Sequence, residues 1–339
     1  MSCRVGIAGY GLAGAVFHAP LVAATDGLEV AAIMTRAPER VSAAREEHPY
    51  ARVVDSLEEL LDGIDVLVVA TPNRSHVPIG LAGLERDLCV VVDKPMAATA
   101  AEARQLVAAG GRLTVFQNRR WDDDFLTLAR VLAAGELGDL VRFESRYERY
   151  RPDVRSQAWR EAGDPADGGG QLLDLGPHVV DQAVRLLGRP TAVYAEIATR
   201  RPGAVVDDDA FLALEHPGGI HSHLWISAAA ALEGPRFRVS GLRAGFATDG
   251  VDPQEDQLQA GLRPGDPAYG AGRTGVLAGE EIPLERGRYE AFYAGVREWA
   301  SGSAPAPVDP ADSLAVLEIL EAARRSSERG QVVRVEEQT

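Results

Sequence analysis

The sequence predicts an α/β fold in two parts: a doubly wound parallel-sheet domain over residues 1–120, then an α+β domain over residues 121–339 with a large, mostly antiparallel sheet. Three observations predict this division. Up to residue 118, continuous apolar runs alternate with amphipathic stretches, as in parallel strands that helices cover on both faces. Later segments alternate apolar with polar residues, which indicates antiparallel strands with one covered face. The 339 residues are also more than one domain usually contains.

Apolar, β-branched runs predict the strands of the first domain, at residues 4–8, 28–34, 66–70, 89–92 and 113–116. Helical stretches follow these runs at residues 12–24, 38–47, 56–61, 75–86 and 99–109. Strand and helix therefore repeat in the order that builds a parallel sheet.

The second domain is predicted to begin with a helix over residues 125–134 and a polar strand over 140–150. A helix starting at Pro177 and ending at Leu187 follows, and then strands at 192–199, 210–215, 220–227 and 237–240. Glycines between the second and third of these strands predict a hairpin turn. Residues 249–281 are rich in Gly, Pro and Asp and predict an exposed excursion, before two helices at 288–300 and 310–329.

The composition indicates which classes of partner and which cellular compartment to expect. The net charge of -15 argues against nucleic acid or an anionic membrane as the main partner. No stretch reaches the length of a membrane span and no secretory leader is evident, so we expect a cytoplasmic protein. Cys3 and Cys89 lie at or inside predicted buried strands, so we expect no disulfide, and without clustered histidines we expect no metal site.

One basic residue differs from all the others. Lysine and arginine together number 35, and Lys94 is the only lysine. Arginine stays protonated in proteins, whereas a lysine can lose its proton when it is desolvated or lies near another cation. If arginine has replaced lysine wherever charge alone is needed, the lysine that remains is a candidate for proton chemistry. Chance survival of a surface lysine is the competing explanation.

A glycine loop follows the first predicted strand and opens the first helix. Its sequence, Gly9-Tyr10-Gly11-Leu12-Ala13-Gly14, has the spacing of a dinucleotide-binding turn within a βαβ unit. The glycines permit a tight turn, a close approach of backbone to pyrophosphate, and packing of helix on strand. The helix N-terminus then offers N–H donors to phosphate. A Rossmann domain is therefore expected.

The end of the second strand indicates which dinucleotide binds. An acidic residue there usually binds the ribose hydroxyls of NAD. This chain has Thr35 and Arg36 at this position instead. The first acidic residue after the strand is Glu39, and Arg40 lies one helical turn beyond Arg36. A hydroxyl and guanidinium groups suit a 2′-phosphate, so NADP is favoured and NAD is the second choice. The alternative is that these arginines are simply solvated.

Three further motifs resemble the glucose–fructose oxidoreductase/inositol dehydrogenase (Gfo/Idh/MocA) family. They are Thr71-Pro72-Asn73 with His76 after one strand, Asp93-Lys94-Pro95 after the next, and the segment 168–178 that ends at Asp174-Leu175-Gly176-Pro177-His178. In that family Thr-Pro-Asn borders the nicotinamide, and a Glu-Lys-Pro motif supplies the catalytic lysine. Asp93 replaces the glutamate here, which keeps the charge and shortens its reach. Residues 10–21 and 115–122 are most similar to the NADP-linked, scyllo-inositol dehydrogenase-like branch.

The resemblance implies Lys94, Asp174 and His178 as catalytic residues. Lys94 lies just past the carboxyl end of a parallel strand, where ligands bind in this architecture. Asp174 and His178 are four residues apart and share a face if that segment is helical, although a helix starting at Pro177 leaves Asp174 just outside it. A carboxylate near an imidazole can orient it for acid–base work. Whether Lys94 or His178 is the principal base stays open.

The remaining expected contacts fall into two sets. The cofactor set is Gly9, Gly11, Leu12, Ala13, Gly14, Thr35, Arg36, Arg40, Thr71, Pro72, Asn73, His76, Asp93, Lys94 and Asn118. The substrate set is Tyr10, Lys94, Trp121, Trp159, Asp174 and His178, and ordinary packing is the alternative for the tryptophans.

The expected function is hydride transfer between nicotinamide and a hydroxyl carbon of a sugar, inositol or other polyol. Two alternatives remain: a dinucleotide-sensing regulator without turnover, and an NAD-dependent glycoside hydrolase of the same fold. We also expect a homodimer or homotetramer assembled through the second sheet.

Overall fold

The computed structural model describes residues 2–154 and 169–335. Its first sheet has six parallel strands in the order β3-β2-β1-β4-β5-β6. The strands are β1 (Cys3–Ala8), β2 (Leu28–Met34), β3 (Arg52–Val54), β4 (Val66–Val69), β5 (Cys89–Asp93) and β6 (Leu113–Phe116). The predicted doubly wound domain is confirmed. The short strand β3 was not predicted, because its three residues are too few to form a recognisable apolar run.

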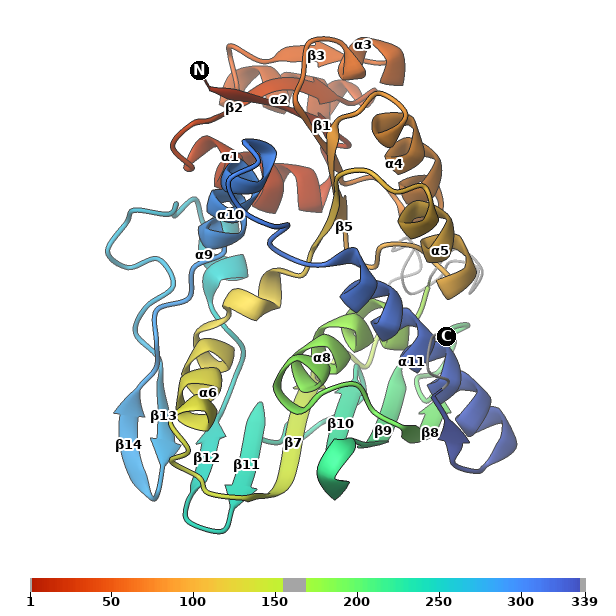
Figure 1. Ribbon diagram of the computed structural model, residues 1–339, viewed down its shortest axis with the longest axis vertical. Coiled ribbons are helices and arrows are strands. Elements are labelled where there is room, and N and C mark those ends of the chain that lie inside the picture. Colours follow the sequence, from red (N-terminus) through yellow and green to blue (C-terminus); the bar gives the residue numbers. More distant parts are fainter. Residues whose placement is uncertain (1, 155–168, 336–339) are drawn as a thin grey trace.

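Helices connect these strands on both sides of the sheet (Figure 1). They are α1 (Ala19–Ala23), α2 (Pro38–Glu47), α3 (Leu57–Leu61), α4 (His76–Leu84) and α5 (Ala100–Ala108). A π-helical turn over Ala13–His18 precedes α1, so the helix predicted after the glycine loop is present with a widened first part. Ser56 and Thr99 cap α3 and α5 by accepting hydrogen bonds from the backbone N–H groups of Glu59 and Glu102.

The second sheet has nine strands in the order β14-β13-β12-β11-β7-β10-β9-β8-β15. Only the β7–β10 pair is parallel, and the other pairs are antiparallel, as predicted. The strands are β7 (Leu140–Glu148), β8 (Ala192–Ala198), β9 (Asp209–Glu215), β10 (His221–Ser227), β11 (Phe237–Gly241), β12 (Gly245–Thr248), β13 (Thr274–Leu277), β14 (Glu280–Pro283) and β15 (Val333–Arg334). The predicted hairpin is formed by β9 and β10.

The later helices are α6 (Asp123–Ala133), α8 (Gln171–Leu187), α9 (Gln254–Gln259), α10 (Glu290–Ala300) and α11 (Pro310–Arg329). Helices α8 and α11 lie over the second sheet, whereas α10 returns to the first domain beside α1 (Figure 1). In the part of the chain that the structure describes, no helix meets the length and apolarity that a membrane crossing requires.

Helix α8 begins earlier than predicted. The expected start at Pro177 is wrong, because the helix begins at Gln171 and Pro177 lies inside it. Asp207 satisfies the first turn: its backbone carbonyl accepts from the Gln171 N–H and its carboxylate from the Leu172 N–H. Asp174 therefore lies within the helix, one turn before His178.

The excursion predicted for residues 249–281 is exposed at most of its residues, but the prediction missed its buried residues and its secondary structure. This segment contains α9, β13 and β14, and it buries Asp252, Gln254 and Tyr269. Its polar residues form internal hydrogen bonds: the Asp252 carboxylate accepts from the Asp123 N–H at 2.8 Å, and Gln254 accepts from the Tyr289 N–H at 2.8 Å. Polar composition here supports a buried turn instead of a solvated loop.

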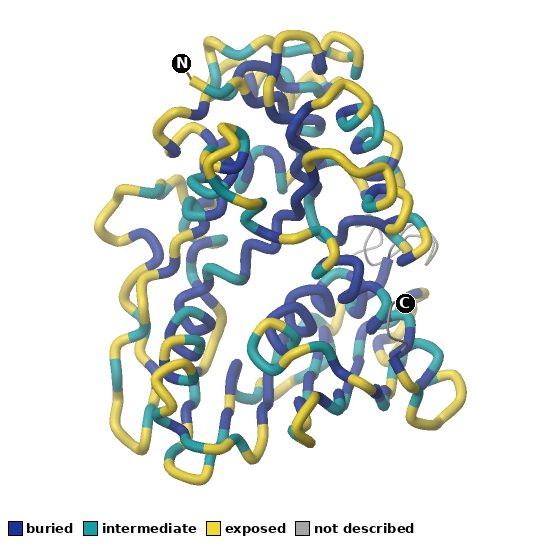
Figure 2. Tube along the Cα trace, viewed as in Figure 1, coloured by how far each residue is buried: buried dark blue, intermediate teal, exposed yellow. Residues whose placement is uncertain are grey.

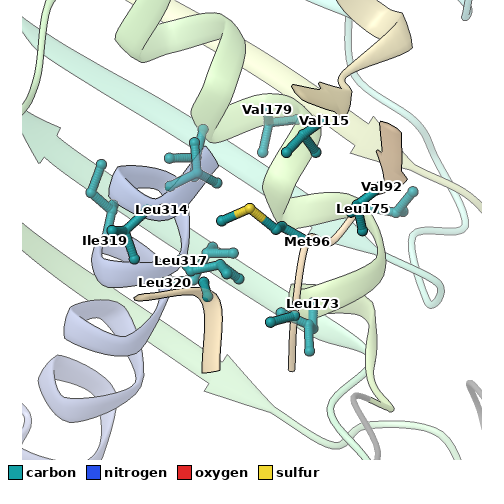
Figure 3. Packing of buried hydrophobic residues seen from close by; sticks show 14 of the residues in the cluster. Val92, Met96, Val115, Leu173, Leu175, Val179, Leu314, Leu317, Ile319 and Leu320 are labelled. Carbon is teal, nitrogen blue, oxygen red and sulfur yellow. The ribbon is translucent and has the colours of Figure 1, made fainter. Parts of the chain in front are cut away.

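The strands of both sheets are largely buried, and exposed residues lie on connections and outer helix faces (Figure 2). The contact between the two domains includes Met96, which is 1% exposed and packs among residues of β5, α8 and α11 (Figure 3). Met96 follows Lys94 by two residues. The backbone that carries Lys94 is therefore anchored in a close-packed core.

Candidate active site

Two hollows meet at the carboxyl end of β5. The glycine-loop groove, of about 600 Å³, runs along the loop after β1 and the ends of β2 and β4. The inner cavity, of about 680 Å³, lies between β5, α8 and α9. Leu12, Ala13, Asp93 and Lys94 line both hollows. A ligand in the groove therefore reaches the cavity at Lys94.

The glycine loop has the shape that a dinucleotide requires. Gly9 has a φ of +99°, and a Cβ there would lie 2.6 Å from the carbonyl oxygen of Ala70. A Cβ on Gly14 would overlap the carbonyl of Gly9. A Cβ on Gly11, in contrast, would meet nothing within 4 Å, because this residue opens into the groove. The loop thus has close backbone packing on one side and free access for a pyrophosphate on the other, so its residues fit the cofactor.

Thr35, Arg36 and Arg40 line the end of the groove beside β2. Thr35 is buried and Arg40 is exposed. Arg36 donates from Nε to the carbonyl oxygen of Asp55 at 2.9 Å, which fixes the direction of its guanidinium. Among the described residues that line the groove, the sole carboxylate is Asp93, at the opposite end. This end therefore presents positive charge to a ligand.

Thr71, Pro72 and Asn73 line the groove as the resemblance implies, whereas Asn118 lines the inner cavity. His76 is 1% exposed and is not a lining residue of either hollow. Its ring nitrogens lie 2.7 Å from the carbonyl oxygen of Thr71 and 2.9 Å from that of Pro95. His76 therefore joins the loop after β4 to the loop after β5 and positions both.

Lys94 and Asp174 form a pair at the junction of the hollows. Lys94 Nζ donates to the backbone carbonyl of Asp174 at 2.8 Å and to its carboxylate at 3.2 Å. Both side chains keep some exposure to the cavity. The pair brings the loop after β5 against the first turn of α8, so two motifs separated by 80 residues form one site.

Asp93 holds the backbone of Lys94 in place. Its carboxylate accepts the Lys94 backbone N–H at 2.9 Å and lies 3.8 Å from Nε2 of the fully buried His18. His18 in turn lies 2.6 Å, through Nδ1, from the hydroxyl of Tyr293 on α10. Burial would raise the pKa of Asp93, but the neighbouring His18, Lys94 and His76 outweigh this effect and lower it. Asp93 is thus held as an anion beside the lysine.

His178 lies on α8 one turn after Asp174 and lines the inner cavity. Its side chain is buried, and within the described structure its Nδ1 atom has no hydrogen-bond partner. Burial lowers the pKa of His178 well below its usual value, and the nearby cations Lys94, Arg119, Arg236 and Arg149 lower it further. The imidazole is therefore neutral at neutral pH and can accept a proton.

Two other expected substrate residues, Tyr10 and Trp121, do not line the inner cavity. Tyr10 lines the glycine-loop groove and donates from its hydroxyl to Glu47 at 2.6 Å. Trp121 packs against Phe292, with ring centroids 5.6 Å apart, and does not line either hollow. Trp159 lies outside the described residues.

Several lining residues of the inner cavity were not anticipated. They are Arg119, Arg149 and Arg151 around the end of β7, and Asp252, Glu255 and Asp256 at α9. Arg149 and Arg151 are two residues apart on extended backbone, so a period of two could have placed them on one face. The acidic residues carried no such signal, because they belong to the segment expected to be an exposed excursion.

Comparisons with known proteins agree with this geometry. The family model described as "Oxidoreductase family, NAD-binding Rossmann fold" matches residues 3–115, and "GFO/IDH/MocA C-terminal domain" matches residues 125–247. The oxidoreductase YdgJ of Escherichia coli (strain K12) is 40% identical, over 94% of this chain and 94% of its own. The scyllo-inositol 2-dehydrogenase (NADP(+)) IolW of Bacillus subtilis (strain 168) is 36% identical, over 98% of this chain and 96% of its own.

A solved structure extends the agreement to three dimensions. The yvaA structure from Bacillus subtilis superposes with a TM-score of 0.91 at 34% identity, covering 99% of this chain and 100% of the other. Sequence and fold therefore match over nearly the full length. The chain belongs to the Gfo/Idh/MocA family of oxidoreductases, with an NAD-binding Rossmann domain at its N-terminus.

Proposed function

We propose that the chain is an NADP-dependent dehydrogenase or reductase that acts on a hydroxyl carbon of a sugar, an inositol or another polyol. The observation that carries this proposal is that two proton-handling groups line the inner cavity, which joins the glycine-loop groove. Lys94 lies where the two hollows meet, and the neutral imidazole of His178 faces the inner cavity. The similarity to IolW, an NADP-linked inositol dehydrogenase by name, supports the same substrate class.

The residues can share the work of alcohol oxidation. NADP bound in the groove supplies the hydride acceptor, or the hydride donor in the reverse direction. His178 accepts the proton of the substrate hydroxyl, because burial and the surrounding cations keep its ring unprotonated. Lys94 donates a hydrogen bond to the same oxygen and stabilises its developing negative charge. Asp174 holds Lys94 in this direction through the contacts at 2.8 and 3.2 Å.

The direct test is a spectrophotometric screen at 340 nm of inositols, aldoses and linear polyols, with NADP and NAD in parallel. We expect reduction of NADP by at least one of these compounds. Tight NADP binding without turnover of any of them would favour a sensing role instead. Release of sugar from a glycoside without net reduction of the cofactor would favour a glycoside hydrolase.

Preference for NADP depends on the positive end of the groove. We expect the double variant Arg36→Gln/Arg40→Gln to raise KM for NADP by about 10-fold or more and to leave KM for NAD nearly unchanged, because charge-assisted bonds to the 2′-phosphate are lost. Steady-state kinetics with both cofactors measures this. Arg45→Gln, on α2 with Arg40 but at a position that does not line the groove, is the matched control. An equal effect on both cofactors would contradict the assignment of these arginines to the 2′-phosphate.

We also propose that the protein is a homodimer or homotetramer through the second sheet. Phe211 on β9 and Trp225 on β10 are paired in register, with ring centroids 5.1 Å apart, on the face opposite the buried Leu212 and Leu224. Sedimentation of the native protein and of Trp225→Glu tests this. A native monomer would contradict it.

A further inference from the structure

The wall of the inner cavity beside His178 carries more positive charge than a neutral polyol needs. Arg149 follows β7, and its backbone N–H donates to the carbonyl of Ser227 at 2.9 Å. Arg151 is fixed in the same way to Ala228 at 2.8 Å. The alternation of extended backbone sends both side chains to one side, and both line the cavity together with Arg119.

The guanidinium of Arg119 has its own acidic partners. It is 5% exposed, lies 3.4 Å from the Asp122 carboxylate and 3.1 Å from that of Glu255, and donates to the Tyr289 hydroxyl. Its charge is therefore compensated within the protein. Arg119 therefore has a structural role in the cavity wall and does not need a ligand to balance its charge.

Arg149 is different. Its guanidinium carbon lies 5.2 Å from the centroid of the Tyr147 ring, and among the described residues it has no carboxylate partner and no side-chain hydrogen bond. The ring supports the cation from one face and leaves its N–H donors available. A half-buried guanidinium that lines a cavity in this state is suited to a ligand that brings an acceptor.

The surroundings of Arg149 strengthen this reading. Arg119 and Arg236 also lie over the Tyr147 ring, at 4.9 and 5.3 Å, and that ring lies 6.5 Å from the ring of His178. Arg236 is bound by neutral partners, Ser145 and Gln182. The hydroxyl of the buried Tyr147 and Nδ1 of His178 have no hydrogen-bond partner within the described structure. Cations and unsatisfied polar atoms thus gather at one place, where an anionic ligand would lower the electrostatic cost.

The carboxylates on the opposite wall do not cancel this charge. Glu255 is paired with Arg119, and Asp256 is exposed on α9. Burial and the neighbouring Asp123 raise the pKa of Asp252 to about 7, so this group is partly protonated at neutral pH. Asp174 is engaged by Lys94. Among the described residues, none of these carboxylates forms an ion pair with Arg149.

We propose that the substrate carries an anionic group, a carboxylate or a phosphate, which Arg149 binds while the reacting hydroxyl lies at Lys94 and His178. This inference rests on the proposed polyol chemistry and narrows it to acidic sugar derivatives. Arg149 then determines specificity and takes no part in proton transfer. The cavity of about 680 Å³ has room for a six-carbon chain with such a substituent.

Three compounds with the same six-carbon chain separate the contribution of the anionic group to binding from that of the hydroxyl groups. D-Glucitol is neutral, D-gluconate replaces one terminal carbinol by a carboxylate, and D-glucitol 6-phosphate carries a phosphate. Calorimetric titration into the NADP-saturated protein is expected to show about 10- to 100-fold tighter binding of at least one anionic compound than of glucitol, the range of a charge-assisted contact. Which of the two binds more tightly identifies the anionic group.

The variant Arg149→Gln is expected to remove this advantage and to leave glucitol and NADP binding unchanged, which also reports that the variant is folded. Arg142→Gln, on an exposed position of β7 that does not line the cavity, should keep the advantage. Equal binding of all three compounds by the parent overturns the inference, and so does an anion advantage that survives in Arg149→Gln. Turnover of glucitol by the parent with a kcat/KM equal to or above that of both anionic compounds overturns it as well while supporting the proposed function. Arg149-dependent anion binding without any turnover supports the anion site and contradicts the proposed function.

Discussion

Replacing Lys94 by arginine is expected to lower turnover by about 10²- to 10⁴-fold, the usual contribution of a positioned proton-transfer group, while the affinity for NADP is retained. The substitution keeps the positive charge at the junction of the hollows but removes a group that can give up a proton. The site is also shaped for an ammonium, because one nitrogen contacts both the carbonyl and the carboxylate of Asp174, at 2.8 and 3.2 Å. A guanidinium is larger than an ammonium and holds its N–H donors in one plane, so arginine does not reproduce the geometry of the ammonium at this position.

Single-turnover kinetics at 340 nm, with NADP affinity measured by fluorescence, separates these effects. The reciprocal exchange Arg104→Lys, at an exposed position of α5 whose guanidinium pairs with Glu318 of α11, is the matched control and should turn over like the parent. Lys94→Met supplies the comparison without charge. If Lys94→Arg keeps the activity of the parent and Lys94→Met loses it, only charge is required and proton chemistry at Lys94 is wrong.

The first domain could be predicted from the sequence because its signals are local. Strands buried on both faces form continuous apolar runs, so β1, β2, β4, β5 and β6 were found close to their observed bounds. The start of α8 could not be predicted in this way. Its first N–H groups depend on Asp207, which lies beyond the end of the helix in sequence, and the rule that proline opens a helix pointed to Pro177 instead.

The same distinction applies to the site. The glycine loop and the motif around Lys94 lie directly after strands, so their place at the carboxyl edge of the sheet follows from the architecture. The meeting of Lys94 with Asp174 was implied by the family resemblance and has no local signal. Arg149 and Asp252 were missed, because a charged residue at the end of a strand or in a glycine-rich segment is usually solvated. Their burial depends on the packing of α9 and β7 around a shared cavity.

His178→Asn is the second substitution expected to have a large effect, with a loss of about 10²- to 10⁴-fold in kcat/KM for oxidation. Asparagine keeps a hydrogen-bonding side chain of smaller size but cannot accept a proton. In the parent, burial and then the cations around His178 lower its pKa well below the usual value. The parent should therefore keep kcat/KM as the pH falls through about 6.5, where an ordinary histidine would be half protonated. The exposed His221→Asn, on β10, is the control and should match the parent throughout.

Stability against pH gives an independent test of the same shift. Between the usual histidine pKa of about 6.5 and the lower pKa in the folded state, the unfolded chain binds a proton at His178 that the folded chain does not. The contribution of His178 to the free energy of unfolding must therefore fall as the pH drops below about 6.5, and His178→Asn must remove that contribution. Other buried groups, such as His76 with its lowered pKa and Asp123 and Asp252 with pKa values raised to about 7, contribute in opposite directions and are the same in both proteins. Urea unfolding at pH 7.5 and pH 5.5 measures the difference. Equal pH dependence in parent and variant would mean that the folded protein protonates His178 as readily as the unfolded chain does, which would contradict a lowered pKa at this position.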